Sequence, residues 1–221
     1  MFILLKHQVI KTIEKIPLLQ IFIYNNLKYF NFLFPHDKDY YALRILFKLN
    51  EKRSFIDVGG NIGLSTIGFR ELGFKSNKIH IFEPDKNLIK LYLKKIKKNY
   101  SNLIIHSFGL SNKGYYSKLY KAFYKNVFFH FNNSFSKTYI KKKLFENYGE
   151  KSKEFRIKSS KFELKKFDGL NIRDEICFVK IDVEGLDHLA LYGMQYCIRK
   201  YSPVILVEYN FNNFNKIYNF L

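Results

Sequence analysis

The residues with the clearest chemical potential are two acids, Asp57 and Glu83, each at the end of a short apolar run. Asp57 leads into the turn Gly59-Gly60-Asn61-Ile62-Gly63, and Glu83 lies twenty residues beyond the last glycine of that turn. Glycines let a backbone approach a ligand closely, asparagine tolerates a left-handed backbone, and an acid at this distance suits the hydroxyls of a ribose. The pattern therefore predicts the front half of a nucleotide-cofactor site.

A parallel sheet would bring these residues together, because the carboxyl ends of its strands meet at one edge. Short apolar runs predict strands over residues 54–58, 79–82, 103–108, 177–182 and 204–208. Periodicity and glycine or proline boundaries predict helices over residues 62–72, 86–99, 185–196 and 214–221. In the second helix, Leu88, Leu91 and Ile96 are expected to face inward. Repeated strand–helix units predict an α/β fold with a doubly wound, mostly parallel sheet and helices on both faces.

The alternation of strand and helix breaks between residues 114 and 166. This stretch has many aromatics, several lysines and few helix signals, so it predicts strands over residues 116–120, 127–131 and 155–164 but no clear crossover helix. An insertion of about fifty residues without its own crossover is usually functional or covers a site. Most rings between residues 115 and 139 are expected in the core, with an acceptor pocket as the alternative.

The later strands are also followed by acids, namely Asp182, Glu184 and Glu208. Together with Asp57 and Glu83, they are expected to lie along one edge of the sheet, where they would repel the pyrophosphate of a dinucleotide. S-adenosylmethionine has no phosphate, carries a sulfonium cation and offers ribose hydroxyls and an amino group to acidic partners. The charge pattern therefore favours S-adenosylmethionine over NAD as the cofactor.

The chain resembles the FkbM family of S-adenosylmethionine-dependent methyltransferases in three strings: Asp57-Val58-Gly59-Gly60-Asn61-Ile62-Gly63, Phe82-Glu83-Pro84-Asp85 and Val179-Lys180-Ile181-Asp182-Val183-Glu184-Gly185. The resemblance continues through residues 109–114, 167–170, 192–194 and 203–208. It implies a Rossmann-like methyltransferase fold and methyl transfer, usually to a hydroxyl of a sugar or another small molecule. The family fold normally continues with a final antiparallel strand pair, which this chain is expected to lack.

The resemblance also assigns cofactor contacts by motif position. These are Asp57, Gly59, Gly60, Asn61 and Gly63 for the methionine part, Glu83 for the ribose, and Ser111 or Asn112 near the adenine. Two positions depart from the family pattern, because Gly60 stands where alanine is usual and Asp187 stands where glutamate is usual. Glycine at position 60 still permits the turn. Aspartate at position 187 has a shorter side chain than glutamate, so it reaches less far from its helix.

Candidate catalytic residues follow the fourth predicted strand: Asp182, Glu184 and His188. Methyl transfer mainly requires alignment of acceptor, methyl and sulfur, followed by removal of the acceptor proton. Asp182 is expected to orient the acceptor or to coordinate the methionine amine. Glu184 could be a base or a helix N-cap, and His188, one helical turn later, a base or a partly exposed helix histidine. A magnesium site made by all three is a minor alternative, and no metal is expected.

The formal net charge is +19, and it comes almost entirely from lysine. It indicates either lysines scattered over a solvated surface or attraction to anionic partners. The expected partner is a small-molecule or glycan acceptor, anionic acceptors included, whereas nucleic acid is disfavoured because no Asn/Asp-Pro-Pro-Tyr motif is present. A nucleic-acid methyltransferase, an NAD-dependent oxidoreductase and a non-catalytic domain stay open as alternatives, and so does the oligomeric state.

Two regions are expected along the chain: a helical segment over residues 1–50 that packs on the domain, and a methyltransferase domain over residues 51–221. The uncharged run over residues 16–27 is too short to span a bilayer, and no small-residue cleavage site follows it. The alternative for this segment is an amphipathic helix at the inner membrane face. Cys177 and Cys197 form no CxxC motif, so neither a disulfide framework nor a zinc site is expected, and a cytoplasmic location fits.

Overall fold

The computed structural model describes residues 17–19, 22, 38–48, 50–125, 127–183, 185–208 and 211–221. The chain forms two compact units, and each is described here by itself. The larger comprises Asn31–Ser117 with Phe162–Leu221, and the smaller includes Lys118–Lys161. Most of the predicted N-terminal segment, residues 1–50, lies outside the described residues, so the domain boundaries stay predictions.

The larger unit is built on a five-stranded sheet with the strand order β3-β2-β1-β8-β9. The strands are β1 (Ser54–Val58), β2 (Ile79–Phe82), β3 (Leu103–His106), β8 (Ile176–Ile181) and β9 (Val204–Val207). Every neighbouring pair in this sheet is parallel. The predicted parallel α/β fold is therefore confirmed, and this sheet contains no antiparallel strand among the described residues. The register places Asp57 beside both Ile81 and Lys180.

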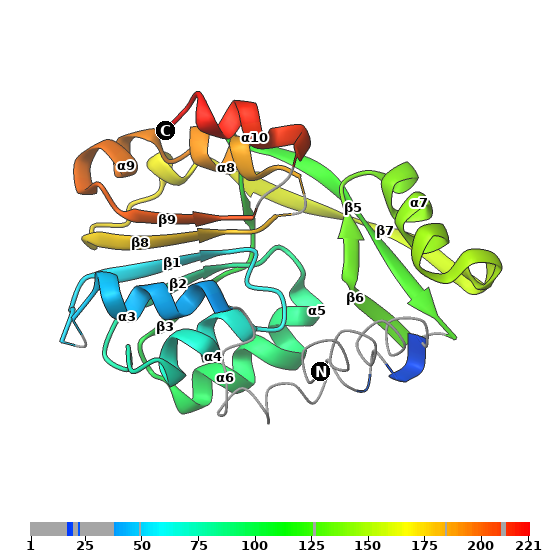
Figure 1. Cartoon of the computed structure of the whole chain (residues 1–221), viewed down its shortest axis with the longest axis horizontal. Coiled ribbons are helices and arrows are strands. Elements are labelled where there is room, and N and C mark those ends of the chain that lie inside the picture. The colour runs from blue at the N-terminus through cyan, green and yellow to red at the C-terminus, as the bar shows by residue number, and fades with distance from the viewer. Residues whose placement is uncertain are drawn as a thin grey trace, which may run out of the picture. The chain divides into compact units, whose positions relative to one another are not determined.

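Helices cover both faces of this sheet (Figure 1). One face carries η1 (Lys38–Tyr41), α3 (Ala42–Leu46), α4 (Leu64–Glu71), α5 (Lys86–Leu88), η2 (Ile89–Leu93) and α6 (Lys94–Asn99). The other face carries α8 (Asp187–Tyr192), α9 (Gln195–Tyr201) and α10 (Phe211–Tyr218). The helix predicted over residues 185–196 is thus two helices, since α8 ends at Tyr192 and α9 begins at Gln195.

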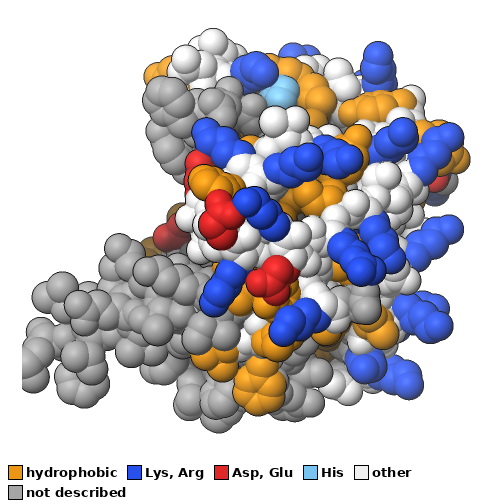
Figure 2. Space-filling view, turned by 90° about the vertical axis from the view of Figure 1, so that its right-hand side faces the viewer, with side chains coloured by type: hydrophobic (Ala, Val, Ile, Leu, Met, Phe, Trp, Pro, Cys, Tyr) orange, Lys and Arg blue, Asp and Glu red, His pale blue; other side chains and the backbone are white. Residues whose placement is uncertain are grey.

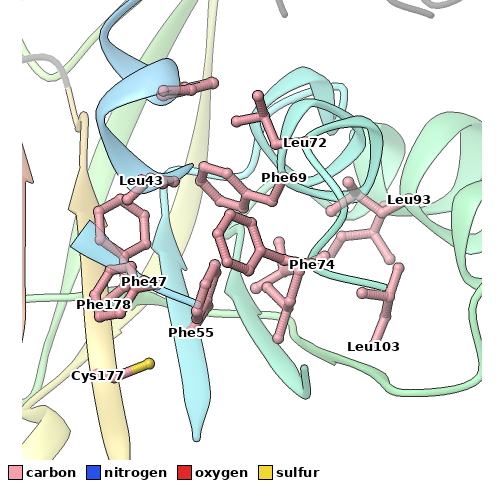
Figure 3. Close-up of a cluster of buried hydrophobic side chains, with 14 residues drawn as sticks. Leu43, Phe47, Phe55, Phe69, Leu72, Phe74, Leu93, Leu103, Cys177 and Phe178 are labelled. Carbon is pink, nitrogen blue, oxygen red and sulfur yellow. The ribbon is translucent and has the colours of Figure 1, made fainter. Parts of the chain in front are cut away.

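Alternating strand residues fill a separate core on each face of the sheet. Phe55 and Phe178 face α4, whereas the next residues, Ile56 and Val179, pack with the opposite helix layer. Figure 3 shows the first core, in which the Phe55 ring lies 5.8 Å from Phe69 and 5.3 Å from Phe178, centroid to centroid. Buried apolar residues on both faces explain why these strands read as continuous apolar runs.

The expected inward position of Leu91 is wrong, because its side chain is 48% exposed. Residues Ile89–Leu93 form a π-helical turn between α5 and α6. A π-turn inserts one extra residue into the helix, so the positions after it rotate relative to regular 3.6-residue spacing. Leu88 and Leu93 are buried instead, and Ile96 is partly buried against the same core.

The smaller unit contains a helix that was not predicted. Between β6 (Val127–Ser134) and β7 (Phe155–Lys165) lies α7 (Lys137–Tyr148), followed by the 3-10 segment η3 (Gly149–Glu154). The Ser136 side chain caps α7 by accepting the Tyr139 N–H. The buried side of α7 is a stripe one residue wide, formed by Ile140, Leu144 and Tyr148. Lysines flank this stripe, so the sequence shows only a weak amphipathic pattern.

The strands predicted in this region are confirmed but longer than expected. β5 (Tyr115–Tyr124) pairs with β6 in antiparallel orientation, and β4 (Gly109–Leu110) pairs with β7 in parallel orientation. Of the rings between residues 115 and 139, Tyr124 and Phe129 are buried with α7, whereas Tyr116 and Tyr139 are exposed.

Lysine and arginine side chains are spread over one face of the molecule, with few acids among them (Figure 2). Residues 118–161 alone contain twelve lysines and arginines against three glutamates. Within the part of the chain that is described, no helix has the length and apolar content needed to cross a bilayer.

Two histidines of the larger unit form a buried pair at β2 and β3. His80 Nδ1 lies 3.1 Å from His106 Nε2, and His80 Nε2 lies 2.8 Å from Asp174 Oδ2. Burial, reinforced by the neighbouring His80, lowers the pKa of His106 from its ordinary 6.5 to about 4. These histidines therefore have a structural role in the described fold.

We therefore expect acid to destabilise the protein through His106. The folded state holds this imidazole neutral while the unfolded state protonates it, so the contribution is complete above pH 6.5 and is lost as the pH falls towards 4. His106→Gln, which still offers His80 a hydrogen-bond partner, should reduce the stability loss between pH 6.5 and pH 4 by about 1 kcal/mol, since partial solvent access screens the effect. Chemical denaturation of both proteins across this range measures it, and parallel pH profiles would contradict it.

Candidate functional site

The turn after β1 is held against the ends of both neighbouring strands. Gly59 N–H and Gly60 N–H both donate to the Phe82 carbonyl, at 2.9 and 3.2 Å, and Asp182 N–H donates to the Val58 carbonyl at 3.1 Å. Gly59 has φ 84°, Asn61 has φ 47° and Gly63 has φ 86°, so the left-handed backbone anticipated for asparagine is present. The predicted turn therefore lies at the carboxyl edge of the sheet, between β2 and β8.

Two glycines of this turn are required by space. A Cβ atom on Gly59 would lie 1.9 Å from the backbone carbonyl oxygen of Asp182. A Cβ atom on Gly60 would lie 2.2 Å from the Cγ2 methyl of Ile81. The neighbour of Gly59 is a backbone atom directly after β8, whereas the neighbour of Gly60 is a side-chain methyl. Only position 59 is therefore rigidly closed to a larger residue.

Glu83 directly follows β2 and braces the turn. Its Oε2 accepts the Asn61 N–H at 2.8 Å, and its Oε1 accepts the Asp85 N–H at 2.8 Å. The residue is only 5% exposed. The predicted contact of Glu83 with a ribose stays a prediction. The structure thus shows a bracing contact for Glu83 that the sequence did not reveal.

The Asn61 side chain offers a hydrogen-bond acceptor to a ligand. Its Oδ1 atom is buried and has no hydrogen-bond partner among the described residues. A buried carbonyl without a donor is costly in a finished site, so the atom fits an N–H or O–H group supplied by a ligand.

Asp57 is completely buried and its carboxylate is held by the protein. Its Oδ2 accepts the Thr66 hydroxyl at 3.0 Å, and its Oδ1 lies 3.6 Å from the Lys180 ammonium. Burial raises the pKa of Asp57, an effect that Lys180 and the Thr66 hydrogen bond oppose. Its side chain therefore lies beneath the turn, on the α4 side of the sheet.

Lys180 is the site residue that the sequence reasoning missed. It lies on β8, is 6% exposed and places Nζ 3.3 Å from Asp182 Oδ2 and 3.4 Å from the Gly59 carbonyl. Burial disfavours its charge, but Asp182 and Asp57 outweigh that penalty and hold the pKa of Lys180 above its ordinary value. A lone lysine within an apolar strand, two residues before an acid, is the sequence signal that could have identified it.

Asp182 is partly open to solvent, unlike Asp57. Its side chain is 43% exposed, and it lies directly after β8 with one oxygen on Lys180. Glu208 follows β9 at the same edge and is exposed. The predicted gathering of acids at one edge of the sheet is confirmed for Asp57, Glu83, Asp182 and Glu208, and Glu184 lies outside the described residues.

The helix predicted to begin at residue 185 begins at Asp187 instead. The spacing expected between residues 184 and 188 stays a prediction, because residue 184 lies outside the described residues. His188 is in the first turn of α8, its Nδ1 is buried without a partner among the described residues, and its ring lies 5.9 Å from Tyr192. Burial and then Lys216 lower the pKa of His188, so its neutral form, which can accept a proton, prevails at pH 7.

Asp187, the second departure from the family pattern, organises the loop after β8. The residue is 1% exposed, and its two carboxylate oxygens accept the N–H groups of Val183 at 2.9 Å and Gly185 at 3.2 Å. Burial raises the pKa of Asp187, and the two backbone hydrogen bonds counteract that rise. The aspartate therefore ties Val183 and Gly185 to the start of α8.

The predicted adenine contacts differ in exposure. Ser111 is fully buried and its hydroxyl lies 3.3 Å from the Tyr115 hydroxyl, whereas Asn112 is exposed. A Cβ atom on Gly193 would lie 2.1 Å from the Ser111 carbonyl oxygen, so the start of this loop packs closely on the end of α8. No group of three or more His, Cys, Asp or Glu residues within the described ranges could hold a metal ion.

Comparison with known proteins gives one family and one solved structure. The family model described as the methyltransferase FkbM domain matches residues 57–221. The crystal structure of methyltransferase FkbM from Methylobacillus flagellatus KT is similar at 17% sequence identity, with a TM-score of 0.47, over 71% of this chain and 32% of that one. This chain thus spans about a third of the length of that protein. No curated protein matches the chain.

Proposed function

Because the chain belongs to the FkbM methyltransferase domain family, we propose that it is an S-adenosylmethionine-dependent methyltransferase. The proposed acceptor is a hydroxyl group of a sugar, glycan or related small molecule, as the family resemblance implies. Cofactor and acceptor both go beyond the family assignment, and the carboxyl edge of the five-stranded sheet supports the cofactor.

The observation that supports this proposal is the excess of hydrogen-bond acceptors around the turn after β1. The Glu83 carboxylate braces the turn, Asn61 Oδ1 lacks a donor among the described residues, and Asp182 is partly open to solvent. The buried ammonium of Lys180 is already shared by two carboxylates. A ligand rich in donors and positive charge suits this edge, whereas a pyrophosphate would meet carboxylates.

The residues present fit S-adenosylmethionine in three places. Glu83 would hold the ribose hydroxyls, the close backbone at Gly59 and Gly63 would border the methionine part, and Asn61 Oδ1 or Asp182 would accept from its amino group. When bound, the cofactor supplies an electrophilic methyl group on a positively charged sulfur. Ser111 and Asn112 remain the proposed neighbours of the adenine.

The protein must also orient the acceptor hydroxyl and take its proton. Asp182 is the first choice for this task, because its carboxylate lies 3.3 Å from the Lys180 ammonium and is still partly exposed. His188 is the second choice, because its neutral imidazole has an unpaired buried nitrogen. Glu184 stays a candidate from the sequence alone. Lys180 is excluded as the base, since two acids keep it protonated.

Calorimetric titration with S-adenosylhomocysteine tests the proposed cofactor. We expect saturable one-to-one binding, and a rise in the thermal unfolding midpoint with ligand concentration, because a ligand that binds only the folded state stabilises it by mass action. NADH is the control ligand and should not bind. Micromolar binding of NADH without binding of S-adenosylhomocysteine would instead favour an oxidoreductase, and binding of neither would favour a non-catalytic domain.

A further inference from the structure

The buried ammonium of Lys180 links three parts of the site. Its Nζ lies 3.3 Å from Asp182 Oδ2, 3.6 Å from Asp57 Oδ1 and 3.4 Å from the Gly59 carbonyl oxygen. The flanking residues of β8, Val179 and Ile181, are fully buried and apolar. A lysine is placed in such surroundings only when strong partners compensate for its desolvation.

The charges of this cluster are unequal in number. Two carboxylates and one ammonium leave one net negative charge when all three groups are ionised. Three groups raise the pKa of Lys180 through their charge: Asp182, which follows β8, Asp57 from β1 and Tyr40 from η1. Thr66 from α4 donates to the far oxygen of Asp57. Without Lys180, a fully buried carboxylate would lie near a second acid with no cation between them.

We propose that Lys180 is a positioning residue of the cofactor site, which holds Asp182 beside the Gly59 turn and compensates the buried charge of Asp57. This inference rests on the proposed function, because Asp182 and the Gly59 turn are parts of the proposed cofactor site. Lys180 acts through the two acids, and it neither touches the reacting atoms nor takes a proton.

The first test needs no cofactor and measures stability against pH between 5 and 8, above the ordinary pKa of an aspartate. In Lys180→Met, Asp57 should take up a proton in the folded state, and a raised folded-state pKa of an acid makes stability fall as the pH rises. The unfolding midpoint of this variant should therefore drop progressively below that of the wild type. Lys180→Met/Asp57→Asn should remove this pH dependence, and Lys52→Met, at an exposed lysine, should behave like the wild type.

Folding failure of the single variant does not end this test. If Lys180→Met does not fold but the double variant does, the unbalanced charge is the cause and the proposal is supported. If neither folds while Asp57→Asn alone does, the lysine is needed for another reason and the proposal is overturned. A stability difference between Lys180→Met and the wild type that does not change with pH would also overturn it.

The second test compares two ligands that differ in charge. Sinefungin carries an ammonium group where S-adenosylmethionine has its sulfonium, and S-adenosylhomocysteine is uncharged there. In the wild type, the ratio of their affinities should change less than about twofold between pH 6 and pH 8. In Lys180→Met the acid pair should release its proton over this range, so the preference for sinefungin should rise about tenfold, a factor that corresponds to about 1.4 kcal/mol.

The two tests separate this inference from the proposed function. An affinity ratio in Lys180→Met that matches the wild type at every pH would overturn the role of Lys180 in setting the charge of the site. If the wild type binds neither ligand, the proposed function fails, and the role of Lys180 in cofactor binding fails with it. The stability measurement then decides by itself whether Lys180 compensates the buried charge of Asp57.

Discussion

Gly59→Ala is expected to destabilise the protein by about 3 kcal/mol and to abolish binding of S-adenosylhomocysteine. The new Cβ would lie 1.9 Å from the Asp182 carbonyl oxygen and 3.0 Å from its carbon, and φ at this position is +84°. The left-handed backbone costs an alanine about 1–2 kcal/mol, and forcing two strand ends apart adds about 1–3 kcal/mol. The displaced groups include the carboxyl end of β8, which carries Asp182.

Chemical denaturation and calorimetry check this prediction, with Gly169→Ala as the matched control. A Cβ atom on Gly169 meets no atom within 4 Å, and its φ is not in the left-handed range. The control should change the free energy of unfolding by less than about 0.5 kcal/mol. Equal stability of the two variants would show that the β1 turn and β8 can move apart freely.

Glu83→Ala is expected to reduce the affinity for S-adenosylhomocysteine at least about 100-fold, a factor that corresponds to about 2.7 kcal/mol. The carboxylate accepts the N–H groups of Asn61 and Asp85, and it is the proposed partner of the ribose hydroxyls. Loss of hydrogen bonds to a charged group costs about 1.5–3 kcal/mol each. The variant should therefore lose stability as well as affinity.

Calorimetry on folded protein separates the two roles of Glu83. Glu71→Ala, at an exposed carboxylate on α4, is the matched control and should change neither property. If Glu83→Ala loses stability but its folded fraction binds S-adenosylhomocysteine as the wild type does, Glu83 only braces the turn. That result would remove the ribose contact from the proposed site.

The strands and the turn could be predicted because their signals are local. β1 and β8 are buried on both faces, so each reads as an apolar run, and in a parallel sheet an acid at each strand end must reach the same edge. At Gly59, Asn61 and Gly63, the residue type alone indicates a left-handed backbone conformation. The acids and the turn that lie at this edge of the sheet could therefore be predicted from the sequence alone.

Lys180 and Asp187 were not predictable in the same way, because their roles depend on tertiary partners. A lysine in a sequence normally indicates an exposed position. Lys180 is buried because two carboxylates compensate its charge, that of Asp57 on β1 and that of Asp182 directly after β8. Asp187 is a short acid at a helix start, and its bonds to Val183 and Gly185 require a loop that folds back on α8. The same reason explains Leu91, since a π-turn leaves no clear mark in the local sequence.

Gly60, in the turn after β1, lies against the side chain of Ile81, on β2. The family usually carries alanine at the first of them, and here a Cβ would meet the Cγ2 methyl of Ile81 at 2.2 Å. A valine at position 81 keeps that branch, whereas a leucine lacks it. Exchanges at the two positions are therefore expected to be coupled: alanine at position 60 should be tolerated better with leucine at position 81 than with isoleucine.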